Sequence, residues 1–192
     1  MSIEIGPATN EEIPEIEAIL AHGVRSKMYR GDLAWGETIT NEDRLRATIA
    51  GGNMYLAYSG DDIIGVFMLF WDDPARWGQQ PPDSGYLHRL VVAPGLRGDN
   101  VGGQIIDLIC HSLADQGRTY LRLTCPSGNQ QLQRYHLAHG FVRADSKARP
   151  ARSPDALAYF ERPVIEKPEE RNASESKPTL ASRLRKSFWT KP

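Results

Sequence analysis

The alternation of apolar and polar residues along the first half of the chain predicts a strand, two helices and a hairpin. Residues 3–5 alternate as in a half-buried strand, and residues 9–10 can cap the helix that follows. Asn41, followed by two acidic residues, begins a second helix. The apolar runs at 54–59 and 63–71 flank a polar turn, which predicts two paired strands.

The stretch from Tyr86 to Gln116 organises the rest of the chain. Its run Leu90–Val92 is apolar and β-branched and ends at a Pro-Gly turn, as a buried strand does. Apolar residues then recur at helical spacing, and the first turn of this helix contains Gly102 and Gly103. A helix start with bare amide N–H groups at its positive dipole end is suited to a phosphate.

The second half of the chain continues the alternation of strands and helices. Residues 120–124 alternate as a strand, and Asn129 caps a helix that stops at Gly140. Two further strands, beginning at Phe141 and spanning 156–161, complete the pattern. The predicted order is β-α-α-β-β-β-α-β-α-β-β, a mixed α/β sheet with helices on both faces.

Composition and charge divide the chain into a domain at 1–162 and a tail at 163–192. The tail carries seven Lys/Arg and four Asp/Glu, so the net charge of −1 hides a mildly acidic body, which argues against a nucleic-acid partner. The tail begins as a polar, proline-broken linker. Its basic end spaces Leu180, Leu184 and Phe188 as one helix face, which leaves two alternatives open: a disordered end, or an amphipathic helix docking on anionic lipid or a partner.

Two cysteines, Cys110 and Cys125, form no metal-binding or disulfide pattern, as expected in a reducing compartment. The first residues lack the basic and apolar regions of a signal peptide, so a cytoplasmic location is expected. No metal is expected, and either a monomer or a homodimer fits the sequence.

Two segments together resemble the GNAT (GCN5-related N-acetyltransferase) superfamily. The first is Arg97-Gly98-Asp99-Asn100-Val101-Gly102, similar to the family's acetyl-CoA loop, Arg/Gln-x-x-Gly-x-Gly/Ala. The second runs from Asn129 to Phe141 and keeps the spacing of the family's N-x-x-A-x-x-x-Tyr-x-x-x-Gly-Phe helix. The predicted order of strands and helices agrees with the family over residues 1–162.

The resemblance implies that acetyl-CoA is the co-substrate and assigns residues to it. Main-chain groups of the strand would pair with pantetheine, and loop amides would hold the pyrophosphate with added charge from an arginine. Asn129 would contact the cofactor from the next helix. The implied cofactor residues are Leu90, Val91, Val92, Arg97, Gly98, Asp99, Asn100, Val101, Gly102, Gly103 and Asn129.

Two residues depart from the family pattern. Asn100 stands where the family usually has glycine, and asparagine tolerates a left-handed backbone best after glycine. His136 stands where the family usually has the tyrosine that protonates the departing thiolate. Either His136 is the acid, or the adjacent Tyr135, turned about 100° around the helix, reaches over instead.

The acceptor side is predicted from loop residues and from one histidine. His88, just before the cofactor strand, is a candidate base, with a packing role as the alternative. Aromatic and acidic loop residues suggest a cationic amine, held by cation–π contact and charge. The candidate acceptor-binding residues are Trp35, Trp71, Asp73 and Tyr86.

The sequence therefore predicts an N-acetyltransferase that acts on a primary amine of a small, cationic molecule by direct attack in a ternary complex. Two alternatives remain open: a non-catalytic acyl-CoA-binding module, and acetylation of a protein N-terminus or lysine.

Overall fold

The computed structural model describes residues 2–28, 37–96, 98–144 and 157–164. Trp35, Arg97 and most of the tail, from residue 165 onward, lie outside these residues. No helix within the described ranges is both long enough and apolar enough to cross a membrane.

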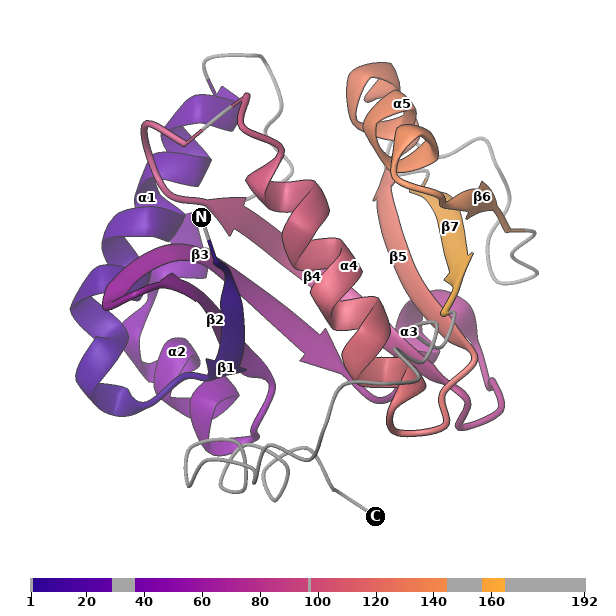
Figure 1. Cartoon of the computed structure of the whole chain (residues 1–192), viewed down its shortest axis with the longest axis horizontal. Helices are drawn as coiled ribbons and strands as arrows, with labels where there is room; N and C mark the ends of the chain where they lie inside the picture. The colour runs from indigo at the N-terminus through magenta and orange to yellow at the C-terminus, as the bar shows by residue number, and fades with distance from the viewer. Residues whose placement is uncertain (1, 29–36, 97, 145–156, 165–192) are drawn as a thin grey trace, which may run out of the picture.

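A seven-stranded sheet forms the centre of the molecule, in the order β1-β2-β3-β4-β5-β7-β6 (Figure 1). Every neighbouring pair is antiparallel except β4 and β5, which are parallel. The strands are β1 (Glu4–Pro7), β2 (Met54–Ser59), β3 (Asp62–Phe70), β4 (Ser84–Val92), β5 (Tyr120–Pro126), β6 (Val142–Arg143) and β7 (Leu157–Pro163).

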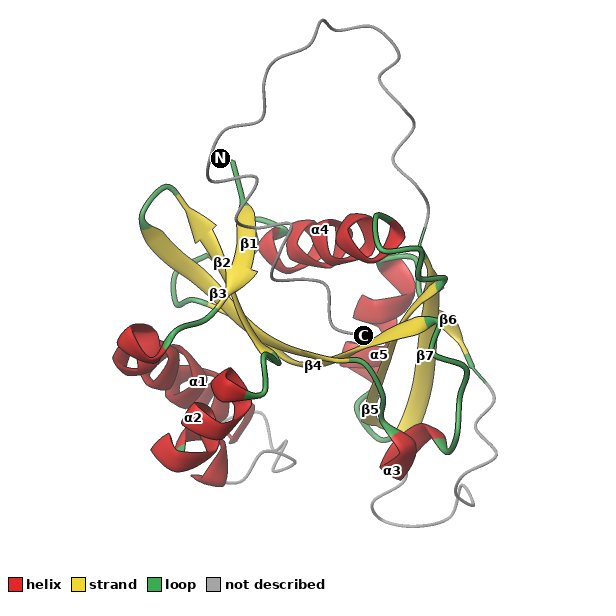
Figure 2. Ribbon diagram, turned by 90° about the horizontal axis from the view of Figure 1, so that it is seen from below, coloured by secondary structure: helices red, strands yellow, loops and turns green. Residues whose placement is uncertain are grey.

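Helices cover both faces of the sheet, with α1 and α2 on one side and α4 on the other (Figure 2). The helices are α1 (Ile13–Met28), α2 (Glu42–Ala50), α3 (Pro74–Trp77), α4 (Val101–Ala114) and α5 (Gln130–Ala138). The predicted mixed α/β order is confirmed. The sequence pattern missed α3 and the last turns of α1, because neither carries a full apolar repeat.

The predicted helix caps are present in the structure. The Asn41 side chain accepts a hydrogen bond from the Arg44 N–H at 3.1 Å, and that of Asn129 accepts one from the Leu132 N–H at 2.9 Å. Thr9 begins the first helical segment, where its N–H donates to the Glu12 carboxylate at 2.7 Å. These bonds satisfy amides that a helix start leaves open.

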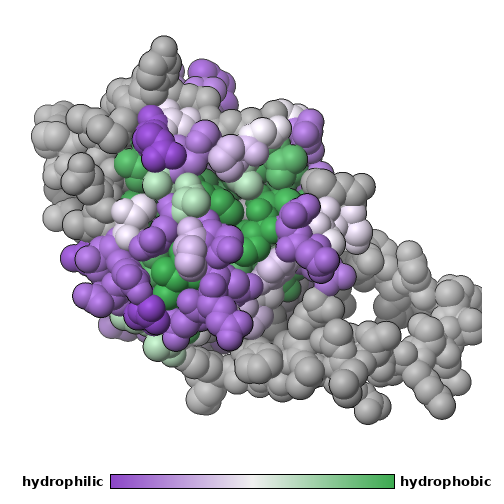
Figure 3. Space-filling view, turned by 90° about the vertical axis from the view of Figure 1, so that its left-hand side faces the viewer, coloured by the Kyte–Doolittle hydropathy of each residue, from purple (hydrophilic) through white to green (hydrophobic). Residues whose placement is uncertain are grey.

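Two apolar clusters, one on each face of the sheet, hold the layers together. One joins α4 to β3, β4, β5 and β7, and the other joins α1 and α2 to β2 and β3. On the side of the molecule that carries α1, hydrophilic residues dominate the outer surface and apolar ones show between them (Figure 3). Because both faces of the sheet are buried, the alternate side chains of each strand must point to a defined face.

The parallel pairing of β4 with β5 is short. Only Ser84–Tyr86 of β4 pair with β5, opposite Tyr120–Arg122. Beyond Tyr86 no described strand pairs with β4 on this side, while β5 continues along β7. The two strands therefore separate toward their carboxyl ends.

A bulge in β4 lies where the strands separate. Val66 of β3 pairs with Val91, but Met68 pairs with His88, so one residue of β3 faces two of β4. Arg89, inside the bulge, has φ 55°, a left-handed conformation that is rare for a side chain of this size. A bulge bends its strand and re-aims the neighbouring side chains.

A buried arginine lies beneath the short parallel pairing. Arg122 donates to the Tyr86 hydroxyl at 3.2 Å and to the Glu161 carboxylate at 3.3 Å. Its guanidinium lies 5.3 Å from the centre of the Trp77 ring of α3. These contacts tie β4, β5, β7 and α3 together at the base of the opening.

Replacing Arg122 is expected to destabilise the domain. Arg122→Met removes the bond to Tyr86 and the contact with Trp77, which together contribute about 2 kcal/mol. Thermal unfolding should show a Tm lower by about 4–8 °C. The matched change Arg46→Met breaks only an exposed pair with Glu42 on α2 and should cost at most about 0.5 kcal/mol. Equal shifts for the two variants would contradict the role assigned to Arg122.

Candidate active site

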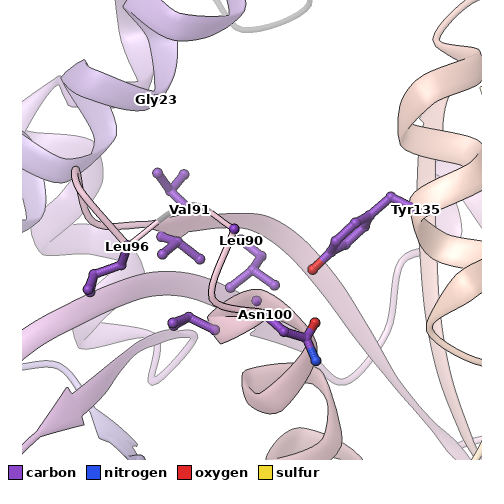
Figure 4. A pocket seen from close by; sticks show the side chains of 10 residues that line it. Gly23, Leu90, Val91, Leu96, Asn100 and Tyr135 are labelled. Atoms are coloured by element: carbon purple, nitrogen blue, oxygen red, sulfur yellow. The ribbon is translucent and has the colours of Figure 1, made fainter. Parts of the chain in front are cut away.

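An open cleft of about 370 Å³ lies where β4 separates from β5 (Figure 4). One wall is the end of β4 and the loop into α4, and Tyr135 of α5 points into the cleft from the other side. Its lining residues are Gly23, Leu90, Val91, Val92, Leu96, Gly98, Asn100, Val101, Gly102 and Tyr135.

The cleft brings together most of the residues predicted from the sequence to hold the cofactor. Seven of them line it: Leu90, Val91, Val92, Gly98, Asn100, Val101 and Gly102. Of the others, Gly103 is buried in the first turn of α4, Asp99 is exposed in the loop, and Asn129 caps α5. Arg97 lies outside the described residues.

The loop before α4 has the left-handed backbone expected at Asn100. Asn100 has φ 55° and ψ 23° as the residue that precedes α4, and Gly98 has φ 102°. Two positive φ values within three residues turn the chain sharply from β4 into the helix. The backbone N–H groups of the first turn of α4 point toward the N-terminus of the helix, which lies at the cleft.

The two glycines of α4 leave space for side chains of α5. A Cβ on Gly102 would lie 2.5 Å from the Tyr135 hydroxyl. A Cβ on Gly103 would lie 2.5 Å from His139 Nε2 and would overlap the side-chain oxygen of Asn100. A side chain at either position would force a neighbouring side chain to move, because α4 and the end of α5 approach closely, and the sequence alone did not indicate this.

Tyr135 and His136, the two candidates for the acid, lie in different surroundings. The Tyr135 hydroxyl faces the cleft, and the pKa of Tyr135 is raised by burial and, secondarily, by the negative charge of Asp107. His136 is 8% exposed, and its ring lies 5.7 Å from that of Phe141 and 5.6 Å from that of Phe160. His136 therefore packs into the apolar layer beneath α5.

His88 forms an ion-pair geometry with a buried carboxylate. Its Nε2 lies 3.1 Å from an Asp73 oxygen, and the edge of its ring meets Phe70. Arg76 lies 3.3 Å from the same carboxylate. Burial alone would raise the pKa of Asp73, but hydrogen bonds and charge from His88 and Arg76 hold this pKa below its usual value. Asp73 was expected to contact an acceptor, whereas in the structure it is paired within the protein.

The other two described acceptor candidates lie away from the cleft. Trp71 packs against the α4 face of the sheet, with the Arg118 guanidinium 5.0 Å from its ring centre. Tyr86 is 2% exposed and bonded to Arg122 at the base of the opening. Contact of both with the acceptor stays a prediction, and in the structure their rings pack against arginine side chains. Trp35 lies outside the described residues.

Comparison with known proteins identifies this arrangement. The model of the Acetyltransferase (GNAT) family matches residues 25–141, more than half of the chain. The chain belongs to the GNAT acetyltransferase family. No curated protein matches the sequence significantly.

Solved GNAT structures share the fold at low sequence identity. An acetyltransferase from Listeria monocytogenes is 17% identical, with a TM-score of 0.70 over 84% of this chain and 95% of that one. The PaiA N-acetyltransferase of Thermoplasma acidophilum, in complex with coenzyme A, is 16% identical with a TM-score of 0.62, covering 85% and 99%. The aminoglycoside acetyltransferase AAC(6')-Ib, also with coenzyme A, is 16% identical with a TM-score of 0.63, covering 84% and 95%.

As a GNAT acetyltransferase, the chain is an acetyl-CoA-dependent enzyme, and the cleft fits this co-substrate. On the side that faces β5, the main chain of β4 beyond Tyr86 has no neighbouring strand among the described residues, so its polar groups on this side can bind an extended, amide-bearing arm. The first turn of α4 offers N–H groups for phosphates at the end of the same strand. The apolar side chains of the strand line the cleft between these two features.

The close approach at Gly102 gives a direct test of the cleft. In Gly102→Ala the new methyl group should displace the Tyr135 side chain, because it would lie 2.5 Å from the Tyr135 hydroxyl. Titration with CoA should show roughly tenfold weaker binding, about 1.4 kcal/mol. The Tm should not fall, because alanine is favoured over glycine in a helix by about 1 kcal/mol.

Gly128→Ala is the matched control, since a Cβ there meets nothing within 4 Å. Equal CoA affinity for the Gly102 and Gly128 variants would show that the cofactor does not occupy this part of the cleft.

Proposed function

We propose that the enzyme transfers the acetyl group of acetyl-CoA to the primary amine of a small molecule, by direct attack in a ternary complex. The observation that carries the proposal is the position of the Tyr135 hydroxyl, which faces the free edge of β4 across the cleft. An acid and a strand edge on opposite walls can hold a thioester between them.

The cofactor is held by the main chain in this proposal. Leu90–Val92 pair with the pantetheine arm, and an N–H of this strand polarises the thioester carbonyl. The loop amides from Gly98 to Gly103, with the charge of Arg97, bind the pyrophosphate. The amide side chain of Asn129 already caps α5, so its contact with the cofactor would use the remaining hydrogen-bonding capacity of this group.

Tyr135 is our choice for the acid. The bond that breaks joins the acetyl carbon to sulfur, and the departing thiolate takes a proton from the Tyr135 hydroxyl. A tyrosine hydroxyl is protonated at neutral pH, and burial raises the pKa of Tyr135 further. His136 stays a candidate from the sequence, but its ring packs against Phe141 and Phe160, away from the lining of the cleft.

His88 is our choice for the base, and Asp73 orients it. With Nε2–H donating to the Asp73 carboxylate, Nδ1 is left as the acceptor for a proton from the attacking amine. The carboxylate also stabilises the imidazolium that forms, as an orienting acid does beside a catalytic histidine. His88 lies two residues before the strand segment assigned to pantetheine, which supports its assignment as the base.

As the acceptor we propose a small cationic amine, as expected from the sequence. Asp72, beside the paired Asp73, is exposed and forms no ion pair within the described part of the chain. The similarly folded AAC(6')-Ib is an aminoglycoside acetyltransferase, which acts on an amine-bearing small molecule.

Paired variants should separate the two candidates for the acid. Tyr135→Phe keeps the ring but removes the hydroxyl, and kcat should fall by about 10²-fold with little change in Tm. His136→Gln places a flexible polar chain in an apolar layer, so it should lower Tm and leave kcat within a few-fold. Steady-state kinetics with thermal unfolding measures both, and the reverse pattern would assign the acid to His136.

A matched series of three amines tests the transfer itself. Butylamine, 4-aminobutanoate and 1,4-diaminobutane share a four-carbon chain but differ in charge. Release of CoA thiol should depend on the amine, and the diamine should have the highest kcat/KM, by roughly tenfold over butylamine. CoA binding without thiol release across these and larger amines would contradict the proposed transfer. Equal rates for the three would contradict only the cationic preference.

A further inference from the structure

His139, which directly follows α5, contacts both walls of the cleft. Its Nδ1 lies 2.8 Å from the backbone oxygen of Tyr135, and its Nε2 lies 2.9 Å from the side-chain oxygen of Asn100. The imidazole also packs on the Tyr135 ring, with centres 4.2 Å apart and planes inclined by 38°. One side chain therefore touches the loop residue before α4 and the candidate acid.

The contact links the two walls of the cleft at the end opposite to its base. At the base the walls are joined by three residue pairs between β4 and β5. At the open end they meet again through His139 and Asn100, which lie 39 residues apart in the sequence. The absent side chain at Gly103 leaves the space in which these two groups meet.

The hydrogen bonds of the ring can be assigned. A carbonyl oxygen only accepts, so the nitrogen facing Tyr135 carries a hydrogen. The other nitrogen accepts from the Asn100 amide when the ring is neutral, or donates to its oxygen when the ring is charged. The two ends of an asparagine amide are exchanged by a simple flip, so the contact is kept in both states.

The backbone of Asn100 is held in place as well. It holds a left-handed backbone, and its own carbonyl accepts the N–H of Gln104 at 3.0 Å as the first bond of α4. A glycine here would adopt this backbone readily but could not reach His139. The side chain of Asn100 thus adds a link between the loop and α5.

We propose that His139 is a positioning residue, which couples the loop before α4 to Tyr135 through Asn100. In this proposal the His139 contacts set both the conformation of the loop that receives the cofactor phosphates and the placement of the Tyr135 hydroxyl. The part that concerns Tyr135 rests on the proposed acetyl transfer, and the coupling to CoA binding rests only on the proposed binding of the cofactor by this loop.

A double-mutant cycle tests the coupling. Asn100→Gly, His139→Ala and the double variant are compared with the unaltered full-length chain for CoA Kd by calorimetry. Each single change should weaken CoA binding by about five- to tenfold, within the usual range of coupling between sites. The double variant should be no weaker than the weaker single one, because both changes break the same link. His111→Ala, in the last turn of α4 at the end away from the loop, is the matched control.

Two further readouts exclude a merely structural effect. Asn100→Gly should not lower the Tm, because glycine suits a left-handed position, and yet it should bind CoA more weakly. His139→Ala should lower kcat as well as raise the KM for acetyl-CoA, since it also frees Tyr135. The proposal is overturned if the losses in CoA affinity add in the double variant, or if His139→Ala binds CoA as the unaltered chain does. If no amine leads to release of CoA thiol, the proposed function is contradicted. The double-mutant cycle measures CoA affinity alone, so it would still decide this inference.

Discussion

The short parallel pairing between β4 and β5 is the constraint on which the rest of the structure depends. Three residue pairs hold the strands together, and beyond Tyr86 the edge of β4 has no neighbouring strand among the described residues. A continuous pairing would use these main-chain groups inside the sheet. Their release, together with the bulge at Arg89, turns a sheet edge inside the domain into a site for an extended ligand.

The two halves of the sheet then contribute different chemistry to one cleft. The first half supplies the end of β4 and the loop before α4, and in our proposal the His88–Asp73 pair as well. The second half supplies Tyr135 from α5. Buried Arg122 joins the halves at the base, and His139 joins them at the open end. In our proposal the base and the acid are thus brought to opposite walls by elements that are separate along the chain.

Patterns that are local in the sequence predicted most of the fold. The apolar periods, the caps at Asn41 and Asn129, and the left-handed Asn100 depend on neighbouring residues, and the structure confirms them. The family motifs likewise assigned the loop before α4, which lines the cleft, to the cofactor. The pairing of His88 with Asp73 could not be predicted, because it depends on how the segment containing α3 folds back on β4.

Contacts made by helices that are far apart in the sequence could not be predicted from it either. The pattern placed Tyr135 and His136 on different sides of one helix, but only the packing of α5 shows which of them faces the cleft. Trp71 and Tyr86 are predicted beside the acceptor by analogy, and the sequence did not indicate that Arg118 and Arg122 contact them. A single histidine after a helix, such as His139, predicts no function from the sequence. Its contact with Asn100 is seen only in the structure.

Amide hydrogen exchange with and without CoA tests the central claim most directly, because it reports on the main chain that is assigned to the cofactor. On addition of CoA, amides of residues 90–92 and 98–103 should exchange more slowly, while those of the β1–β2 pair should be unchanged. Protection elsewhere, with none along the end of β4 and the start of α4, would contradict the account.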